Sequence, residues 1–555
     1  MPGFFVIIVV FNFMNSLKHY ILVIAISLLP IVPVFLTSDI PHTHDGPVHL
    51  ARMAAYYKAL ADGQILPRWA GDLNYGYGMP LFNFIYHLPY LFSSFFIFLR
   101  FSLIDTFKIV LALSFLISGV TMFAFARAFW KDTKKAFLVT IFYQFIPFRI
   151  IELWVRGSYG EVYTYALLPL VLYGLTTNRF VLTAVVTALL IISHNSMSLI
   201  SFGAAALFMM FFSKTNKAKL FNALSLVTGL LLSGFYWLPA LLEHRYTYGD
   251  LFMKDMYRSH FPPLFNFFIP NFTNRPELQT GGISVQWGIF HVIAVILAIL
   301  LLFRKKFIKH KPIFFFSLFL IAASLFLMQP LSAPLWQNVS LLRQFQFPWR
   351  LLGLVGLATS LASVSFLAYP LFKKPLIFTV LVVLTIGSTV WYWQPALGFD
   401  RVTDESQYWN YPLNTTYFGE TDVIWSGGPA TKYPKDRIEI IGGQAVVSQF
   451  MQNGTVQKLH VSASTPALLV SHTQYFPGWN VTIDGQKTPI EFQNPERRGL
   501  ITFTTPEGEH NIVVSLGKTK VQLISELVSL SSLSLLVIAF VISTKQSARR
   551  DLSQI

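Results

Sequence analysis

Apolar segments dominate this sequence, and most of them approach the roughly 20 residues that an α-helix needs to cross a bilayer. They lie near residues 19–37, 81–99, 108–126, 136–151, 160–177, 180–212, 220–242, 284–303, 313–328, 350–370, 375–392 and 521–543. The stretch 180–212 is too long for one span and is interrupted by Ser-His-Asn-Ser, so it predicts two helices. Hydrophobic residues make up 54% of the chain and charged residues only 12%, which indicates a polytopic membrane protein.

Charge and cysteine content exclude several classes of protein. The formal charge of +16 would suggest nucleic-acid binding in a soluble protein, but here it mostly reflects basic cytoplasmic loops, and no nucleic-acid partner is expected. The chain contains no Cys, which rules out disulfides and thiolate metal sites within it. An external domain would therefore have to be stable through packing alone.

Basic clusters orient the spans, because loops rich in Lys and Arg stay on the cytoplasmic side. Such clusters occur at 127–135, 214–219, 304–311, 372–374 and 545–550. All of these clusters lie on the cytoplasmic side only if one of the early apolar segments, 81–99 or 108–126, does not cross the membrane. Segment 81–99 contains His87 and a central Pro89, so we expect it to form a re-entrant or interface-lying hairpin.

This topology predicts about 12 transmembrane helices in the plasma membrane, with both termini cytoplasmic. The expected parts are a transmembrane module over 1–392 with a first external loop at 38–80, an extracytoplasmic β-rich domain over 393–520, and a final helix with a basic tail over 521–555. The short apolar piece Phe4–Phe13 cannot span a bilayer, and translation could start at Met1 or Met14. The fold class is therefore a mostly α polytopic membrane protein with a β-sandwich-like domain near the C-terminus.

Short alternating runs with Asp-Gly and Glu-Gly turns predict the β-sandwich-like domain. Within it, Tyr475, Phe476 and Trp479 lie beside turn residues. They could form a sugar-contacting face, but core or membrane-interface positions are the favoured interpretation.

The first external loop begins with a predicted helix. Asp45-Gly46-Pro47 resembles a helix start, with Asp45 as N-cap, and the helix should run to about Ala61. Helical spacing places Asp45, His49, Arg52 and Tyr56 on one stripe. Spacing alone favours the interpretation that Asp45 only caps the helix and that its polar stripe is solvated. A divalent metal held by His42, His44, Asp45 and His49 is a weaker alternative.

Further polar groups occur at span ends that this topology also places outside. They are Arg156 and Glu161, His194 and Asn195, Glu243 to Arg245, and Arg343 and Arg350. Each alone is an ordinary span boundary, but together they would surround one external cavity at membrane depth, where ionisable groups usually serve function. Guanidinium groups suit phosphate, and carboxylates suit acid/base work on a hydroxyl.

Several motifs carry a resemblance to known families. His-Asp-Gly-Pro-Val-His-Leu (44–50), the stretch 61–90, Val-Arg-Gly-Ser-Tyr-Gly-Glu (155–161), Ser-His-Asn (193–195) and Phe-Pro-Trp-Arg-Leu-Leu (347–352) occur in this order. They are similar to the bacterial membrane proteins called 6-pyruvoyl-tetrahydropterin-synthase-related, to YfhO-type proteins and to the glycosyltransferase-C superfamily. No residue pattern here supports pterin chemistry.

The resemblance implies a membrane glycosyltransferase that moves a sugar from a polyprenyl-phosphate donor to a glycan, lipid or protein acceptor at the outer face. It assigns Asp45 to the acceptor, with Asp39 at the end of the first span as the weaker candidate, and Glu161 to assisting a metal or the acceptor. By position, it assigns donor-phosphate binding to Arg156 and Arg350, and more weakly to Arg52, Arg68 and His194, with Asn195 beside it. The sugar, the acceptor and a requirement for a divalent metal ion stay open.

A transporter or flippase for a lipid-linked or polar substrate is the main alternative, because about a dozen spans with buried charges also fit translocation. The missing internal repeat and the large external domain argue against it. A non-catalytic scaffold that binds glycans is the third interpretation.

Overall fold

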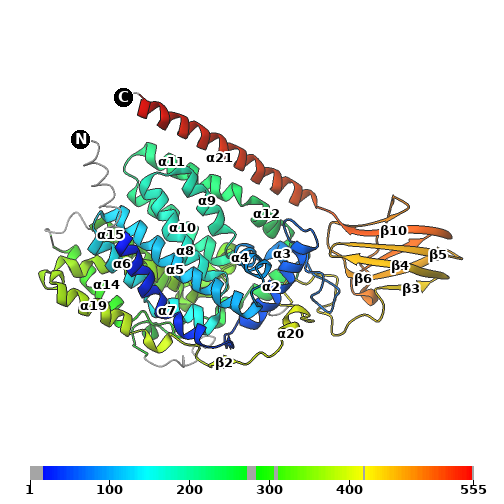
Figure 1. Cartoon of the computed structure of the whole chain (residues 1–555), viewed down its shortest axis with the longest axis horizontal. Coiled ribbons are helices and arrows are strands. Elements are labelled where there is room, and N and C mark those ends of the chain that lie inside the picture. Colours follow the sequence, from blue (N-terminus) through cyan, green and yellow to red (C-terminus); the bar gives the residue numbers. More distant parts are fainter. Residues whose placement is uncertain (1–16, 272–282, 305–310, 417–418, 553–555) are drawn as a thin grey trace.

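The structure is a computed structural model that describes residues 17–271, 283–304, 311–416 and 419–552. The predictions for Phe4–Phe13, and for a start at Met1 or Met14, lie outside these residues. Figure 1 shows a large helical body and a β domain beside it, with the long final helix α21 (Lys520–Leu552) running from the β domain across the body.

The helical body follows the apolar segments closely. Its first half contains a helix over Leu17–Leu28, then α2 (Gly46–Ala61), α3 (Leu81–Phe84), α4 (Leu88–Phe98), α5 (Leu103–Trp130), α6 (Thr133–Gln144), α7 (Pro147–Ile151), α8 (Glu161–Thr177), α9 (Phe180–Ile191) and α10 (Asn195–Phe212). Its second half contains α11 (Asn216–Leu232), α12 (Gly234–Glu243), α13 (Gly249–Met253), α14 (Ile289–Leu302), α15 (Lys311–Leu327), α16 (Ala333–Asn338), α17 (Ser340–Arg343), α18 (Leu352–Ala362) and α19 (Pro375–Gly387).

Among the described residues, five helical segments are long and apolar enough to cross a membrane. They are Leu103–Trp130, Asn195–Phe212, Pro348–Ala368, Pro375–Tyr392 and Lys520–Ile538. Three further pairs of helices pass the same test when each bent pair is taken as one span. The membrane character and the several apolar helices are thus confirmed, whereas the count of 12 spans stays a prediction.

Two apolar segments, 81–99 and 180–212, are each divided into two helices. Segment 180–212 forms two helices, α9 and α10, separated at Ser193 and His194 as expected. Segment 81–99 is divided into α3 and α4, and the 11 residues of α4 are too few to cross a hydrocarbon core of about 30 Å. That segment 81–99 forms a hairpin that does not cross the membrane stays a prediction.

A bent helix pair forms the foundation of the candidate site. Thr133–Gln144 and Pro147–Arg156 meet at 51°, and Pro147 begins the second piece because its missing N–H suits a first helical turn. The pair ends in a π-helical turn, η2 (Glu152–Arg156), and Gly157 follows with φ +64°. A Cβ at Gly157 would also collide with the side chain of Thr43, so this turn fits closely against the first external loop.

Residues 38–80 keep the name first external loop from the predicted topology. The described residues of 393–437, which we call the strap, lie along this loop and connect α19 to the β domain. Strand β2 (Phe399–Asp400) pairs antiparallel with β1 (Ile40–Pro41). Farther along the strap, Glu405 accepts backbone hydrogen bonds from Leu103 and Ile104 at the start of α5. The strap also holds Lys58, whose Nζ donates to the Trp409 carbonyl at 2.7 Å.

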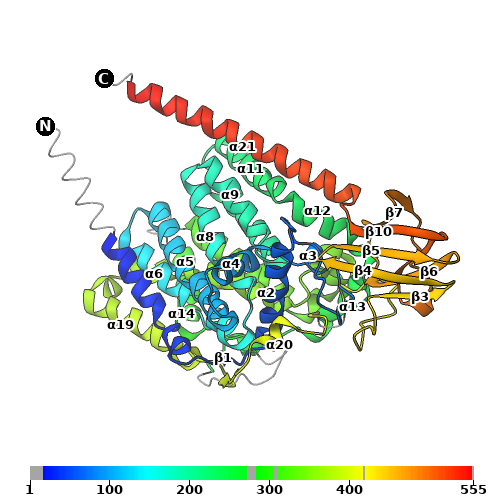
Figure 2. The same cartoon turned by 45° about the vertical axis from the view of Figure 1, so that its right-hand side comes forward.

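The β domain is built from two antiparallel sheets that enclose a core. One sheet has the order β4-β5-β10-β7-β8 and the other the order β3-β6-β9. The strands are β3 (Ile438–Gly442), β4 (Ala445–Asn453), β5 (Val456–Ala463), β6 (Ala467–Gln474), β7 (Trp479–Ile483), β8 (Gln486–Thr488), β9 (Leu500–Thr505) and β10 (Gly508–Leu516). Figure 2 shows the domain at one end of the body, where α21 begins.

Two of the three aromatic side chains singled out in this domain belong to its core. Phe476 and Trp479 are buried, and Trp479 packs edge-on against Trp69 of the first external loop. The sugar-contacting interpretation is therefore wrong for these two. Tyr475 is half-buried and stacks on Phe492 with ring centroids 3.8 Å apart.

Candidate functional site

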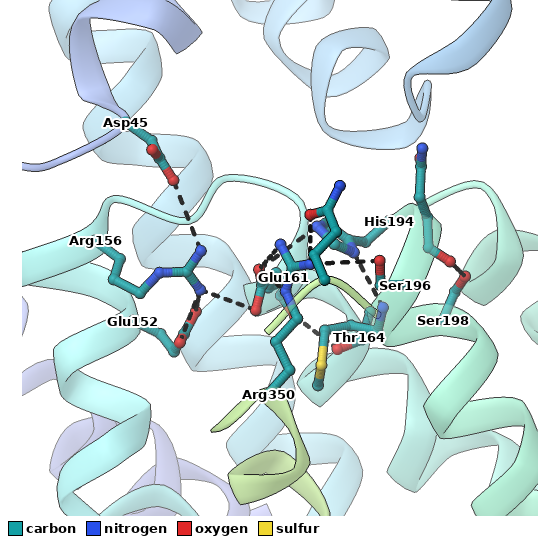
Figure 3. Close-up of polar contacts among 12 residues, drawn as sticks. Asp45, Glu152, Arg156, Glu161, Thr164, His194, Ser196, Ser198 and Arg350 are labelled. Carbon is teal, nitrogen blue, oxygen red and sulfur yellow. Dashed lines mark hydrogen bonds and ion pairs between the residues drawn. The ribbon is translucent and has the colours of Figure 1, made fainter. Parts of the chain in front are cut away.

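Residues from four separate segments meet in one buried cluster of charges. Figure 3 shows Asp45, which precedes α2, Glu152 and Arg156 of η2, Glu161 at the start of α8, His194 before α10, and Arg350 of η8 (Pro348–Leu351). We call these six residues the charge cluster. Five of them were predicted as site residues, and the structure brings those five together.

Glu161 lies at the centre of the charge cluster, and its side chain is only 1% exposed. Arg350 donates to Glu161 Oε1 through Nε at 2.9 Å, and its Nη2 lies at the same distance. Arg156 Nη1 lies 3.0 Å from Glu161 Oε2. This carboxylate therefore joins two guanidinium groups from distant parts of the chain.

Arg156 connects the centre of the cluster to its outer edge. Its Nη1 donates to both carboxylate oxygens of Glu152, at 2.8 and 3.0 Å. Its Nη2 faces Asp45 Oδ2 at 3.8 Å, and its guanidinium lies over the Trp349 ring, 4.6 Å from the ring centroid. The contact to Asp45 is the loosest, so Asp45 is the carboxylate that another group could displace most easily.

His194 faces the cluster with a defined nitrogen. Its Nδ1 accepts a hydrogen bond from the backbone N–H of Met197 at 3.1 Å. In the neutral ring the proton then resides on Nε2, which lies 3.6 Å from Glu161 Oε1. His194 thus presents an N–H toward the central carboxylate.

Asp45 is held in place by its backbone and leaves its carboxylate available. The backbone N–H groups of His44 and Asp45 donate to the carbonyls of Val155 and Arg156 at 3.0 and 2.9 Å. The Asp45 side chain is 43% exposed, in contrast to the buried Glu152 and Glu161. Burial lowers the pKa of the neighbouring His44 below its ordinary value, although Asp45 opposes this shift.

Helix α2 has the predicted bounds and Asp45 occupies the predicted N-cap position, but the expected capping bond of its side chain is absent. Asp45 makes no side-chain capping bond, and Thr43 Oγ1 instead accepts from the Gly46 N–H at 3.1 Å. The solvated stripe is also wrong, since His49 and Tyr56 are buried. His49 and Tyr56 bond Tyr90 and His87, and Arg52 bonds Thr415 of the strap, so these three polar groups are satisfied inside the protein.

The histidines of the first external loop have separate partners. His42 Nδ1 pairs with Asp400 at 2.9 Å, and His49 Nδ1 lies 2.9 Å from the Tyr90 hydroxyl. Burial lowers the pKa of His49 well below its usual range, so its ring is neutral. Within the described residues, no group of three or more His, Asp or Glu side chains is arranged to hold a metal ion.

Three predicted substrate-binding residues lie outside the charge cluster. Arg52 donates to Thr415 of the strap through Nε at 3.1 Å. Asn195 donates to the Phe84 carbonyl at 2.8 Å and accepts from Tyr236. Arg68 is farther along the first loop and pairs with Glu526 of α21 at 3.3 Å.

Sequence reasoning missed Glu152. Its signal was present, because an acidic residue within the apolar run 146–155 requires a buried partner and Arg156 follows one helical turn later. The structure confirms that pairing, and Glu152 is fully buried.

Comparison with known proteins identifies a family. The family described as 6-pyruvoyl-tetrahydropterin synthase related domain, membrane protein, matches residues 82–396, more than half of the chain. No curated protein matches the sequence.

Solved structures with a related outline include two membrane glycosyltransferases. The arabinofuranosyltransferase AftD from Mycobacteria is 18% identical, with a TM-score of 0.41, over 68% of this chain and 27% of its own. The Archaeoglobus fulgidus oligosaccharyltransferase is 12% identical, also with a TM-score of 0.41, over 72% of this chain and 60% of its own. This chain therefore spans less than two thirds of either protein.

Proposed function

We propose that this chain, which belongs to the 6-pyruvoyl-tetrahydropterin synthase related family of membrane proteins, is a membrane glycosyltransferase whose reaction centre is the charge cluster. The proposed donor is a polyprenyl-phosphate sugar, and the proposed acceptor is a hydroxyl group of a glycan, lipid or protein. The observation that carries this proposal is a half-exposed carboxylate, Asp45, beside a guanidinium that is fixed by buried carboxylates.

In the proposed reaction, Asp45 accepts the proton of the acceptor group as that group bonds to the anomeric carbon. The bond from the anomeric carbon to the phosphate oxygen breaks, and the phosphate leaves with its electron pair. Negative charge grows on the phosphate while protonation removes it from Asp45. The outer face of Arg156 is then free to stabilise the leaving phosphate in a water-poor site.

The buried carboxylates have a positioning role in this proposal. Glu152 and Glu161 hold Arg156 from below, and Glu161 also holds Arg350. A guanidinium fixed in advance need not reorganise when charge develops on the phosphate, which favours the transition state.

The test is transfer of a labelled sugar from a panel of short-chain polyprenyl-phosphate sugars by the purified protein in nanodiscs. The Asp45→Asn protein should lose on the order of a hundredfold or more in transfer. Asp400→Asn is the matched control, since the Asp400 side chain is 46% exposed and pairs with His42 of the first external loop. The control should retain activity.

Donor hydrolysis without an acceptor, lost in Asp45→Asn, would still support the enzyme class. Full activity of Asp45→Asn would remove Asp45 from the reaction. Binding of the donors without any turnover, unchanged by Asp45→Asn, would favour the transporter or flippase instead.

A further inference from the structure

A second polar centre lies away from the charge cluster, at the junction of three parts of the chain. A cavity of about 750 Å³ opens between the first external loop, the bend from α11 to α12, and the start of α21 below the β domain. This volume is in the range of pockets that bind small organic ligands. Arg68, predicted as a substrate-binding residue, lines it.

One wall of this junction cavity is apolar and continuous with the outer surface of α21. Leu232 and Phe235 line it from the α11–α12 bend, and Leu530 and Leu533 line it from α21. Leu530 is 59% exposed, on a helix whose apolar window is mostly unburied in the protein. In a bilayer this wall faces hydrocarbon, so the cavity opens sideways into the lipid.

The opposite rim of the cavity is polar. Arg68 Nη2 and Lys518 Nζ both pair with Glu526, at 3.3 and 2.5 Å, so two cations of the lining share one carboxylate. Lys518 is 55% exposed and can turn toward a ligand. A second carboxylate, Glu243, is sealed behind the rim, where it accepts from Asn83 at 2.8 Å.

The junction cavity is separated from the charge cluster by packed side chains of α12 and α3. Phe235 faces the cavity, whereas its neighbour Tyr236 donates to Asn195, next to His194. A ligand in the cavity would therefore touch none of the residues of the charge cluster.

The cavity lining combines an apolar wall open to hydrocarbon with a polar rim that carries Arg68 and Lys518 against one carboxylate, Glu526. This arrangement suits an amphiphile with an anionic head. We infer that the junction cavity binds a bilayer phospholipid with an anionic head group. One acyl chain lies along Leu530 and Leu533, and the phosphate lies near Lys518 and Arg68. The bound lipid would fill the gap between α21 and the first external loop. This site is independent of the proposed transfer reaction.

The test uses the full-length protein in phosphatidylcholine nanodiscs that contain phosphatidylglycerol with a photoreactive diazirine in one acyl chain. After illumination, mass spectrometry should locate cross-links in peptides that contain residues 63–69, 232–235 and 516–533, which line the cavity. Leu530→Trp fills the apolar end of the cavity and should reduce these cross-links about tenfold. This loss corresponds to keeping about two methylene groups of the acyl chain out of the cavity.

Leu535→Trp is the matched control, since Leu535 is 65% exposed on the same helix and lies outside the cavity lining. It should leave labelling unchanged. Lys518→Gln should abolish the preference for a phosphatidylglycerol probe over a phosphatidylcholine probe while retaining the labelled positions.

Three outcomes would overturn the inference. Uniform labelling along the exposed face of α21, equal in Leu530→Trp and Leu535→Trp, would mean that only bulk lipid contacts the helix. Equal labelling by the anionic and zwitterionic probes in the wild type would remove the head-group site. Displacement of the phospholipid by a small molar excess of polyprenyl phosphate would assign the cavity to the carrier instead.

Discussion

Replacing Glu161 by Gln tests whether the central carboxylate stabilises the fold. Glu161 is almost fully buried, and it receives guanidinium nitrogens from Arg156 and Arg350 at 2.9 to 3.0 Å. After the substitution Arg156 keeps Glu152, whereas Arg350 retains only neutral acceptors. A buried cation that loses its counter-charge lowers the free energy of unfolding by about 3–5 kcal/mol.

The corresponding change in melting temperature follows from the size of the helical body. With ~400 residues and an unfolding entropy of ~2 cal/mol/K per residue, we expect Tm to fall by about 4–6 °C. The assay is thermal unfolding in nanodiscs, followed by tryptophan fluorescence. Glu439→Gln is the control, because Glu439 is exposed and pairs with His472 on the β domain, and its loss should shift Tm by less than ~1 °C.

The double variant Glu161→Gln/Arg350→Gln identifies the cause. Removing both charges eliminates the unpaired cation, so this protein should recover at least half of the lost Tm. A single variant that melts with the wild type would refute the reasoning. The reasoning would also be refuted if the loss of Tm in the double variant equalled the sum of the losses in Glu161→Gln and Arg350→Gln alone.

Three further predictions concern the strap, the first external loop and the turn that follows η2. Burial raises the pKa of Asp422 to about 7, so between pH 4 and 7 the folded protein holds a proton that the unfolded chain has released. The free energy of unfolding should therefore fall as the pH rises from 4 to above 7, by at most about 1.4 kcal/mol per pH unit. Asp422→Asn should flatten this profile in pH-dependent melts. Thr43→Val removes the acceptor of the Gly46 N–H and should lower the free energy of unfolding by about 1 kcal/mol in the same melts. A loss of stability in Asp45→Ala but none in Thr43→Val would contradict the assignment of this bond to Thr43. Gly157→Ala should lower both Tm and sugar transfer, because the new Cβ meets Thr43 and the backbone is left-handed there; a fully active protein would show that this turn can shift.

The helices were predictable because a bilayer demands long apolar runs, and the bounds of α2 were predictable from Gly46, Pro47 and Ala61. In outline, the sequence predicted that Arg156, Glu161, His194 and Arg350 lie close together. Charged groups at span ends avoid lipid and pair with one another inside the protein.

The remaining features depend on contacts that no local pattern encodes. His49 and Tyr56 are buried against Tyr90 and His87 at the start of α4. Arg52 of the same stripe is held by Thr415 of the strap, more than 300 residues away. Arg68 was grouped with the other cations because it is in the same loop, yet α21 supplies its partner. Spacing also favoured Asp45 as the cap, but Thr43 accepts the bond.

The pairing of β1 with β2 joins residues 40–41 to residues 399–400. During synthesis the first external loop emerges early, but the segment that covers it follows only after the helices up to α19 have been made. Until then, Arg52 lacks Thr415 and the first turn of α5 lacks Glu405. Until residues 393–437 have been made, the nascent chain therefore carries a first external loop without these partners, and the loop acquires its final packing late in synthesis.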